Sequence, residues 1–308
     1  MPQHIHMAGI IPVAGLETDF NQQLPEVMMP VDAGFTAIQK SVYECAMVGC
    51  QTIWIVANND LAPIIRNTVG EWIYDPVYYD TKTLFPSENR KEIPIYYVPI
   101  HPNDRDKRDS YGWSILYGAY SAWLVAAKIS KWVLPEKYYV SFPMSAYDLP
   151  SLRTHRLEIA SRDANFFLSY DGKTIKDELP IAFTFNGEDF KACRNHINQT
   201  TSREYLPRSP GQTFPTQKLP YDERWSARQF PLNKIFKKVS EKNKIVKSVD
   251  WYYDISKWDN YRAYLGSKNI IEVLKEAKKR DIYSLGFLGN EGGKALDYCD
   301  SAFIVPSD

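Results

Sequence analysis

The chain has 308 residues, and its 37 Lys and Arg balance 37 Asp and Glu, so its formal net charge at pH 7 is zero. A neutral chain argues against broad binding to nucleic acid or to an anionic membrane, because both need a basic surface. With 44% hydrophobic and 24% charged residues, the composition is that of an ordered globular protein with a sizeable core. The sequence shows neither a membrane span nor the pattern of a signal peptide, so we expect no membrane contact and a cytoplasmic location.

The first half of the chain alternates short apolar runs with helical patterns. Apolar runs typical of buried strands occupy residues 10–13, 52–57, 93–100 and 137–142. Apolar residues at helical spacing mark residues 38–48, 61–69 and 114–129, and Gly49 follows the first of these where a helix C-cap belongs. Strand and helix alternate with compact connections. The sequence therefore predicts an α/β, Rossmann-like fold whose mostly parallel sheet has helices on both faces.

The second half is less regular. Residues 166–170 and 181–185 read as strands of a smaller lobe. Residues 200–231 are rich in proline and polar residues, which predicts a long loop or lid. Residues 234–247 are rich in lysine and predict a basic helix with a solvated face.

One motif lies just after the first predicted strand, where the chain opens into a loop at the carboxyl edge of the sheet. Open α/β sheets bind ligands at this edge, and a glycine there lets backbone N–H groups approach a phosphate. The order Ala14-Gly15-Leu16-Glu17-Thr18-Asp19-Phe20, followed by Leu24-Pro25-Glu26, resembles the signature of the sugar-1-phosphate nucleotidyltransferases. The resemblance extends over roughly residues 8–60. It implies a nucleotide-diphospho-sugar transferase-like fold, with nucleotide-binding residues Ala14, Gly15, Leu16 and Thr18.

Three charged residues depart from this signature. Glu17 stands where the family has glycine, Asp19 where it has a phosphate-binding arginine, and Glu26 where it has a lysine. In the family those cations neutralise the triphosphate. Two charges about 4 Å apart interact by about 4 kcal/mol at an effective dielectric of about 20, so attraction becomes repulsion here. Retained activity and a retained fold with lost or altered chemistry both stay open.

A second match lies far downstream, from Trp251 to Tyr261. It resembles the family's late segment, whose aspartate ligates Mg²⁺. The resemblance implies that Asp254 is a catalytic residue and a metal ligand, with the hard oxygen donor that Mg²⁺ requires. The alternative is a strand-end aspartate that caps the following helix. In the family the partner acid directly follows the fourth strand; here no acid appears until Asp148, which becomes the second catalytic candidate if the loop bends back.

The segment Ser110–Ser114 opens the third predicted helix and resembles the family's turn beside the nucleotide base. The resemblance implies that Gly112 and Ser114 bind nucleotide, with the helix N-terminal N–H groups facing an anion. An ordinary helix start explains the same residues. Three cations just upstream either replace the missing positive charge or belong to a solvated loop: Arg105, Lys107 and Arg108.

Residues 266–308 resemble part of a sugar isomerase (SIS) domain of the phosphoheptose isomerase type, with a Gly-Gly-Lys loop within 289–294. The phosphate loop of such domains is missing from the match, so we expect no isomerase activity. We divide the chain into a nucleotidyltransferase-like domain, 1–265, and this SIS-like segment. A segment of about 40 residues is too small to bury a stable core alone. We expect it to dock on the first domain or on a second copy of the chain, as a homo-oligomer.

Two functions remain. The first is an enzyme of sugar-nucleotide biosynthesis that converts an NTP and a sugar 1-phosphate into an NDP-sugar and pyrophosphate, with Mg²⁺ as cofactor. The second is a catalytically inactive homologue that binds a sugar nucleotide or a protein partner. The ordered signature favours the first, and the three acidic departures favour the second.

Overall fold

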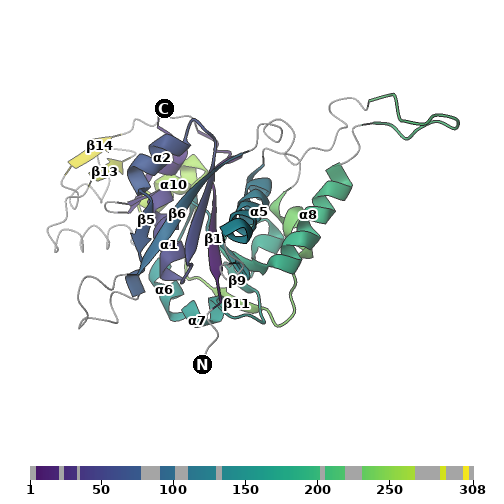
Figure 1. Ribbon diagram of the computed structural model, residues 1–308. Coiled ribbons are helices and arrows are strands. Elements are labelled where there is room, and N and C mark those ends of the chain that lie inside the picture. The colour runs from purple at the N-terminus through teal and green to yellow at the C-terminus, as the bar shows by residue number, and fades with distance from the viewer. Residues whose placement is uncertain are drawn as a thin grey trace.

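The computed structural model describes residues 5–20, 24–32, 35–77, 91–100, 110–129, 134–201, 205–218, 231–267, 285–288 and 301–304. Eight strands form one sheet in the order β11-β9-β10-β7-β1-β4-β6-β5 (Figure 1). Four neighbouring strands at its centre are mutually parallel: β7 (Lys137–Val140), β1 (Met7–Pro12), β4 (Thr52–Ala57) and β6 (Glu92–Pro99). These are the four strands that the apolar runs predict, which confirms the predicted parallel core.

The remaining strands extend this sheet on both sides. On one side β5 (Trp72–Tyr74) is antiparallel to β6. On the other side β10 (Phe183–Asn186) is antiparallel to both β7 and β9 (Phe166–Ser169), and β11 (Ile245–Ser248) is parallel to β9. The prediction that residues 166–170 and 181–185 form a smaller lobe is therefore wrong. Both strands continue the main sheet, because Phe183 pairs with Val140 of β7.

The predicted basic helix over 234–247 is also wrong. The chain forms one turn of helix, α9 (Leu232–Ile235), then a 3-10 turn, η7 (Phe236–Lys238), and then the edge strand β11. Ile235 and Phe236 are fully buried, and Val239 is nearly so, while the neighbouring lysines are exposed. Burial of these three side chains determines the local structure, and the neighbouring lysines take the exposed positions that remain.

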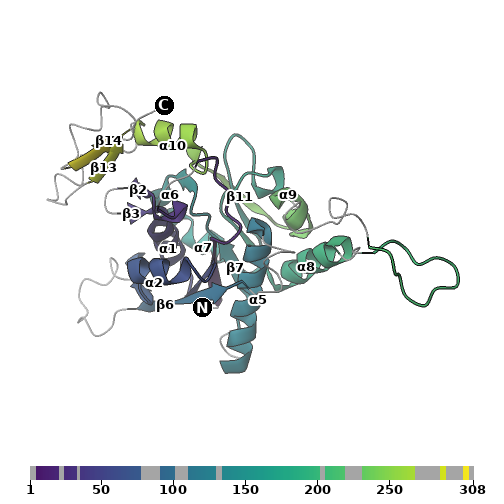
Figure 2. The same ribbon diagram turned by 90° about the horizontal axis from the view of Figure 1, so that it is seen from above.

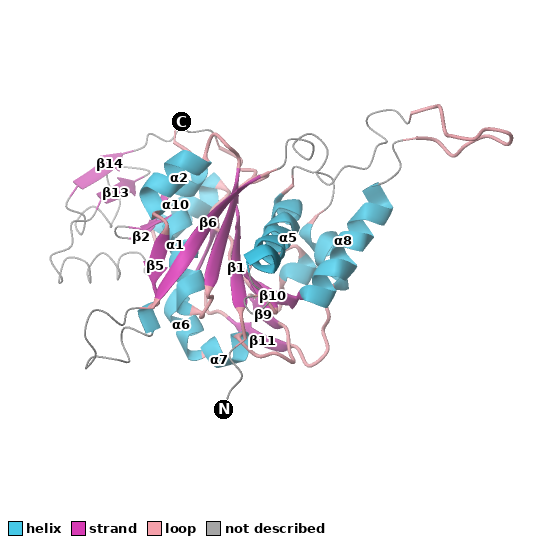
Figure 3. Ribbon diagram, in the orientation of Figure 1, coloured by secondary structure: helices cyan, strands magenta, loops and turns pink. Residues whose placement is uncertain are grey.

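Helices cover both faces of the sheet (Figures 2 and 3). One face packs against α1 (Ala37–Met47), α2 (Ala62–Val69), α6 (Leu149–Thr154) and α7 (Arg156–Ile159). The other packs against α5 (Tyr111–Ile129), α8 (Gly187–Thr201) and α9. Successive strand residues alternate between the two cores, so that Ile11 lies in the first and Ile10 in the second. The predicted α/β fold with helices on both faces is confirmed.

A smaller layer lies beside the main sheet. Here β8 (Ser145–Tyr147) pairs antiparallel with β12 (Tyr252–Asp254), and β2 (Pro30–Asp32) pairs with β3 (Phe35–Thr36). Together with α10 (Trp258–Leu265) they enclose a third apolar cluster, whereas Val27 of η1 (Glu26–Met28) packs in the first core. Met144, Ala146 and Ile255 belong to this cluster, which places the late segment against the loop that follows β7.

Two further strands, β13 (Leu285–Leu288) and β14 (Ser301–Ile304), form a separate parallel pair. The Gly-Gly-Lys loop within 289–294 falls outside the described residues, and the division at residue 265 stays a prediction. Of the described helices, none is both long enough and apolar enough to cross a membrane.

Candidate functional site

A cleft of about 290 Å³ opens at the carboxyl edge of the parallel strands. The segments that follow β1, β6 and β7 form one side of it, and the end of β12 forms another. Of the residues predicted to form the site, Gly15, Leu16, Gly112 and Asp254 line this cleft. The structure therefore brings together residues that lie more than 200 positions apart in the sequence.

Gly15 lies where two backbone segments touch. Its φ of 78° is in the left-handed region, and a Cβ atom there would lie 2.6 Å from the carbonyl carbon of Ser110. The hydroxyl of Ser114 donates a hydrogen bond of 2.6 Å to the carbonyl oxygen of Ala14. The glycine thus allows the loop after β1 to pack on the start of α5. Ala14 and Ser114 are both buried behind the residues that line the cleft, and this hydrogen bond joins them.

Gly112 has a packing reason of its own. A Cβ atom at this position would lie 2.3 Å from the Cδ1 atom of Ile235, which is fully buried in α9. Gly112 therefore lets α9 approach α5, while its backbone still lines the cleft. The structure does not place Thr18 in the cleft lining; its hydroxyl donates to the carbonyl oxygen of Phe20, 3.0 Å away.

Asp254 ends β12 opposite Ser145 of β8. Its Oδ1 accepts hydrogen bonds from the Ser256 hydroxyl at 2.6 Å and the Ser256 backbone N–H at 3.2 Å. Burial, and then the charge of Asp254, raises the pKa of Tyr111, whose ring also lines the cleft. The carboxylate of Asp254 thus shares the cleft with a buried phenol.

The alternative role of Asp254, as the cap of the following helix, is taken by another residue. The backbone N–H of Trp258, the first residue of α10, donates to Oδ1 of Asp19 at 2.8 Å. Asp19 stands at the position that resembles the family's phosphate-binding arginine, and it does not line the cleft. Its carboxylate instead satisfies one of the unpaired donors at the helix start.

The fit of a magnesium ion depends on how many ligands the protein supplies. Among the described residues, no three His, Cys, Asp or Glu side chains are grouped to hold a metal. Mg²⁺ is commonly bound by one or two carboxylates together with substrate phosphates. Asp254 suits that arrangement: it would hold the ion, and the ion would neutralise phosphate charge.

Asp148 lies away from Asp254. In the antiparallel register of β8 and β12, Asp254 pairs with Ser145 and Tyr252 pairs with Tyr147, so Asp148 follows the opposite end of β8. Burial, and then the charge of Asp250, raises the pKa of Asp148. The structure does not bring the two predicted catalytic acids together, and the catalytic role of each stays a prediction.

Sequence reasoning missed several residues that shape the cleft. Glu178 lines it beside Glu17 and Asp254, and the described lining residues include three carboxylates and no Lys, Arg or His. The three upstream cations at positions 105, 107 and 108 lie outside the described residues. Glu178 follows the 3-10 turn η4 (Ile175–Asp177) and has a φ of 67°, in the left-handed region. No sequence pattern predicts this conformation.

A buried ion pair between Lys40 and Glu44 of α1 lies next to the residues that line the cleft. Lys40 Nζ lies 3.4 Å from Oε2 of Glu44 and donates to the carbonyl oxygens of Phe142 and Ser145, at 3.1 and 2.5 Å. Oε1 of Glu44 accepts from the hydroxyls of Tyr139 and Tyr147, at 2.7 and 2.6 Å. The pair thereby holds the loop between β7 and β8. Its sequence signal is a Lys and a Glu at i, i+4 on a helix whose buried residues are mostly apolar.

Comparison with solved structures shows the fold of this chain. A putative glucose-1-phosphate thymidylyltransferase from Bacillus anthracis superposes with a TM-score of 0.51 at 10% identity, covering 84% of this chain and 93% of its own. An apo UDP-glucose pyrophosphorylase superposes with a TM-score of 0.50 at 13% identity, covering 90% and 100%. The chain shares the fold of these sugar-phosphate nucleotidyltransferases. No family model matches it.

Curated proteins match only a short stretch. Phosphoheptose isomerases of a Nitratiruptor species and of Clostridium acetobutylicum are 46% identical over 41 residues and 48% identical over 42 residues. These stretches make up 13% and 14% of this chain. The matches span 22% and 21% of the two isomerases, less than a quarter of their length.

Proposed function

We propose that this chain is a nucleotidyltransferase-like protein of sugar-nucleotide biosynthesis, which converts an NTP and a sugar 1-phosphate into an NDP-sugar and pyrophosphate. The observation that carries the proposal is the convergence of the Gly15 loop, the start of α5 and Asp254 on one cleft. This cleft lies at the carboxyl edge of the sheet, where open α/β sheets bind ligands. The shared fold with proteins named as thymidylyltransferase and pyrophosphorylase supports the same reaction class.

The reaction places simple demands on the cleft. A phosphate oxygen of the sugar 1-phosphate attacks the α-phosphorus of the NTP, the bond from that phosphorus to the bridging oxygen breaks, and pyrophosphate leaves. The backbone at Gly15 and Gly112 offers close approach to a phosphate, and Asp254 would hold Mg²⁺ beside it. Catalysis then comes from positioning and from neutralisation of the phosphate charge.

A second function, binding without catalysis, is favoured by two observations. The carboxylates of Glu17, Glu178 and Asp254 line the cleft without a described cation beside them. Asp19 is engaged with the helix α10 rather than with the cleft. An NDP-sugar carries fewer phosphate charges than an NTP and is repelled less. A homologue that binds a sugar nucleotide but does not form one is therefore the alternative.

A pyrophosphate-release assay separates the two functions. The full chain is incubated with Mg²⁺ and each pairing of the common NTPs with a panel of sugar 1-phosphates, alongside Asp254→Asn. Release that requires both substrates and is lost in Asp254→Asn supports the enzyme. Absence of release from every pair, together with calorimetric binding of an NDP-sugar, supports the binding protein. If neither release nor binding occurs, both are wrong.

A further inference from the structure

A second cavity, larger than the cleft, lies outside it. It is a groove of about 820 Å³ between α5 and α8, which lie side by side in Figure 1. Its floor includes Tyr138 of β7 and the residues just before that strand. The groove therefore opens towards the amino-terminal side of β7, whereas the cleft lies at the carboxyl edge. A volume of this size suits a small molecule.

Aromatic rings form its walls. Tyr120 and Trp123 of α5 are stacked, with ring centroids 6.3 Å apart and an interplanar angle of 27°. Phe190 of α8 faces Tyr138 at 6.5 Å. Trp123 is 45% exposed and lines the groove, so a ligand can reach its ring. These rings offer flat surfaces on which a planar ligand can stack.

A guanidinium lies among these rings. The Cζ atom of Arg194 is 4.6 Å from the centroid of Tyr120 and 6.0 Å from that of Phe190. Arg194 is half-buried, and within the described part of the chain no carboxylate lies within ion-pair distance of it. Because the guanidinium of Arg194 is partly desolvated and has no ion-pair partner, binding of an anion beside it is favourable. The other lining guanidinium, Arg162, is already paired with Glu136 at 2.5 Å.

An unsatisfied acceptor adds a second requirement. The side-chain carbonyl oxygen of Asn198, in the last turns of α8, is buried and has no hydrogen-bond partner. Asn198 lines the same groove. A buried carbonyl of this kind is normally paired. Because the residue lines the groove, a turn of its amide would bring this oxygen to a ligand N–H or O–H group there. The groove therefore suits a ligand that has a flat ring, a negative charge and a hydrogen-bond donor.

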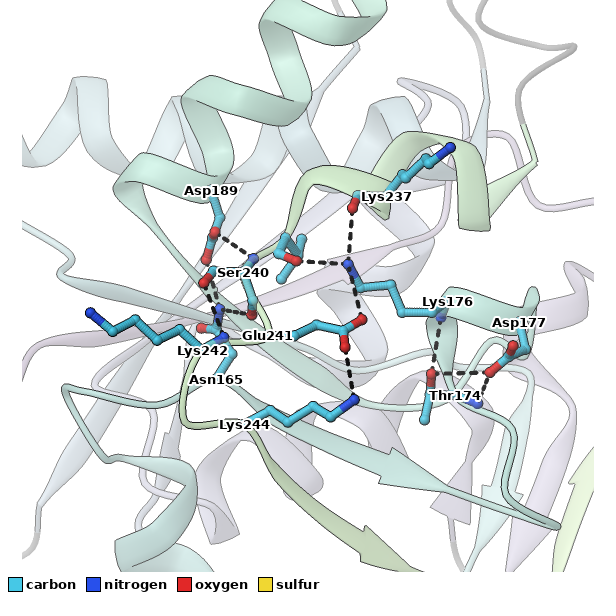
Figure 4. Close-up of polar contacts among 11 residues, drawn as sticks. Asn165, Thr174, Lys176, Asp177, Asp189, Lys237, Ser240, Glu241, Lys242 and Lys244 are labelled. Carbon is cyan, nitrogen blue, oxygen red and sulfur yellow. Dashed lines mark hydrogen bonds and ion pairs between the residues drawn. The ribbon is translucent and has the colours of Figure 1, made fainter.

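The groove is held in shape from the far side of α8. Asp189 accepts hydrogen bonds from the backbone N–H of Ser240 and from the side chain of Asn165, both at 2.7 Å (Figure 4). Close by, Lys176 donates to the carbonyl oxygens of Lys237 and Val239, at 3.1 and 2.7 Å. The Asp189 contacts anchor the start of α8 to Ser240 and Asn165, and the Lys176 contacts tie η4 to the chain around η7. The α8 wall of the groove is therefore fixed at its start.

We propose that this groove is a second ligand site, which binds a planar aromatic anion that carries a hydrogen-bond donor. Arg194 pairs with the anionic group, the rings of Tyr120 and Trp123 stack on the ligand, and Asn198 accepts its donor. Nucleotides and amino-substituted aromatic acids share this chemistry. The site does not depend on the function proposed for the cleft, because none of its residues lines the cleft.

Calorimetry on the full chain tests the site with three probes: CMP, GMP and 4-aminobenzoate. Binding of the nucleotides alone, of 4-aminobenzoate alone or of both supports the site and identifies the kind of anion. We expect Arg194→Met to weaken binding about tenfold, the loss of one charged hydrogen bond, and Asn198→Leu to weaken it severalfold. Arg208→Met, an equal change of charge on the exposed 205–218 segment, is the matched control and should bind as the unmodified chain does.

Two controls keep the outcome clear. Thermal melting shows whether each variant folds, and Trp123→Ala provides a third variant if Arg194→Met does not. Asp254→Asn should leave binding in the groove unchanged, so that a nucleotide bound in the cleft is recognised by its sensitivity to this variant. The proposal is overturned if none of the probes binds, or if binding is indifferent to Arg194, Asn198 and Trp123 alike.

Discussion

Asp19 accepts the backbone N–H of Trp258 at 2.8 Å, and so joins the loop after β1 to the first turn of α10. The two residues belong to the two segments that resemble the nucleotidyltransferase family. Phe20 and Trp258 also pack against each other, with ring centroids 5.6 Å apart. An acid at this position thus serves the packing of α10. The charge departure at Asp19 therefore has a structural role.

The first prediction concerns this contact. Asp19→Arg should lower the free energy of unfolding by about 0.5–2 kcal/mol, the range for loss of a helix N-terminal acceptor. Asp19→Asn keeps an acceptor oxygen and should cost less. Urea unfolding of the three proteins measures the difference. Equal stability of Asp19→Arg and the unmodified chain would show that the Trp258 contact contributes nothing.

The second prediction addresses the acidic cleft. Glu17 and Glu178 are exposed, so screening keeps the repulsion that each exerts on a triphosphate small, about 1 kcal/mol or less. The double change Glu17→Gln and Glu178→Gln should therefore tighten NTP binding by up to about thirtyfold. Calorimetry at low and at high salt measures it, and the gain should shrink as salt increases. Asp163→Asn, an exposed acid that lines neither the cleft nor the groove, is the matched control.

Local sequence patterns predicted the central strands well, because a strand buried on both faces must be continuously apolar. The predicted strand at 52–57 coincides with β4. They failed where long-range pairing decides the structure. Nothing local to Phe183 indicates that it pairs with Val140 of β7, and this pairing places β10 and β9 in the main sheet.

For the candidate site, too, sequence motifs predicted some residues and long-range folding determined the others. Ordered motifs pointed to Gly15, Gly112 and Asp254, which meet in the cleft. They gave no information on Glu178, which arrives there through a left-handed turn, nor on the buried hydroxyl of Tyr111. A motif specifies residue types at fixed sequence positions, whereas Glu178 and Tyr111 reach the cleft because of the way the chain folds.

The third prediction concerns the buried pair beneath the cleft. Lys40→Met should destabilise the protein by about 3–5 kcal/mol, because Glu44 would be left as an uncompensated buried charge. Lys40→Met combined with Glu44→Leu should recover much of the loss. Arg66→Met, which breaks an exposed pair with Glu71, is the control and should change little. Denaturant unfolding measures the difference, and a small effect of Lys40→Met would contradict a stabilising role of the buried pair.

The fourth prediction concerns pH. Burial lowers the pKa of Lys137 to about 8, and its Nζ donates to the carbonyl oxygens of Ser161 and Ala164, both at 2.6 Å. An unfolded lysine has a pKa of about 10.4, so between about pH 8 and pH 10 the unfolded chain binds more protons than the folded one. The destabilisation from this group is thus full below pH 8 and is relieved as pH rises.

The measurement is a difference between two proteins, since tyrosines with raised pKa values act in the opposite direction at high pH. The free energy of unfolding of the unmodified chain minus that of Lys137→Met should increase from about pH 8 to pH 10, by at most about 1.4 kcal/mol per pH unit. A difference that stays level, or falls, would contradict a lowered pKa at Lys137.

The last prediction concerns the residues after Leu265. The parallel pair of β13 and β14 is the only sheet that the structure describes there, and a two-stranded sheet is marginally stable alone. We expect this segment to depend on packing against the preceding domain or a second copy of the chain, where several buried aliphatic side chains at about 1.5–3 kcal/mol each would hold it. Truncation after Leu265 should then lower the melting temperature or change the assembly state. Scanning calorimetry and sedimentation test both, with a change in either supporting the expectation. A shortened protein that melts and sediments as expected for its mass alone would show that the segment is an independent appendage.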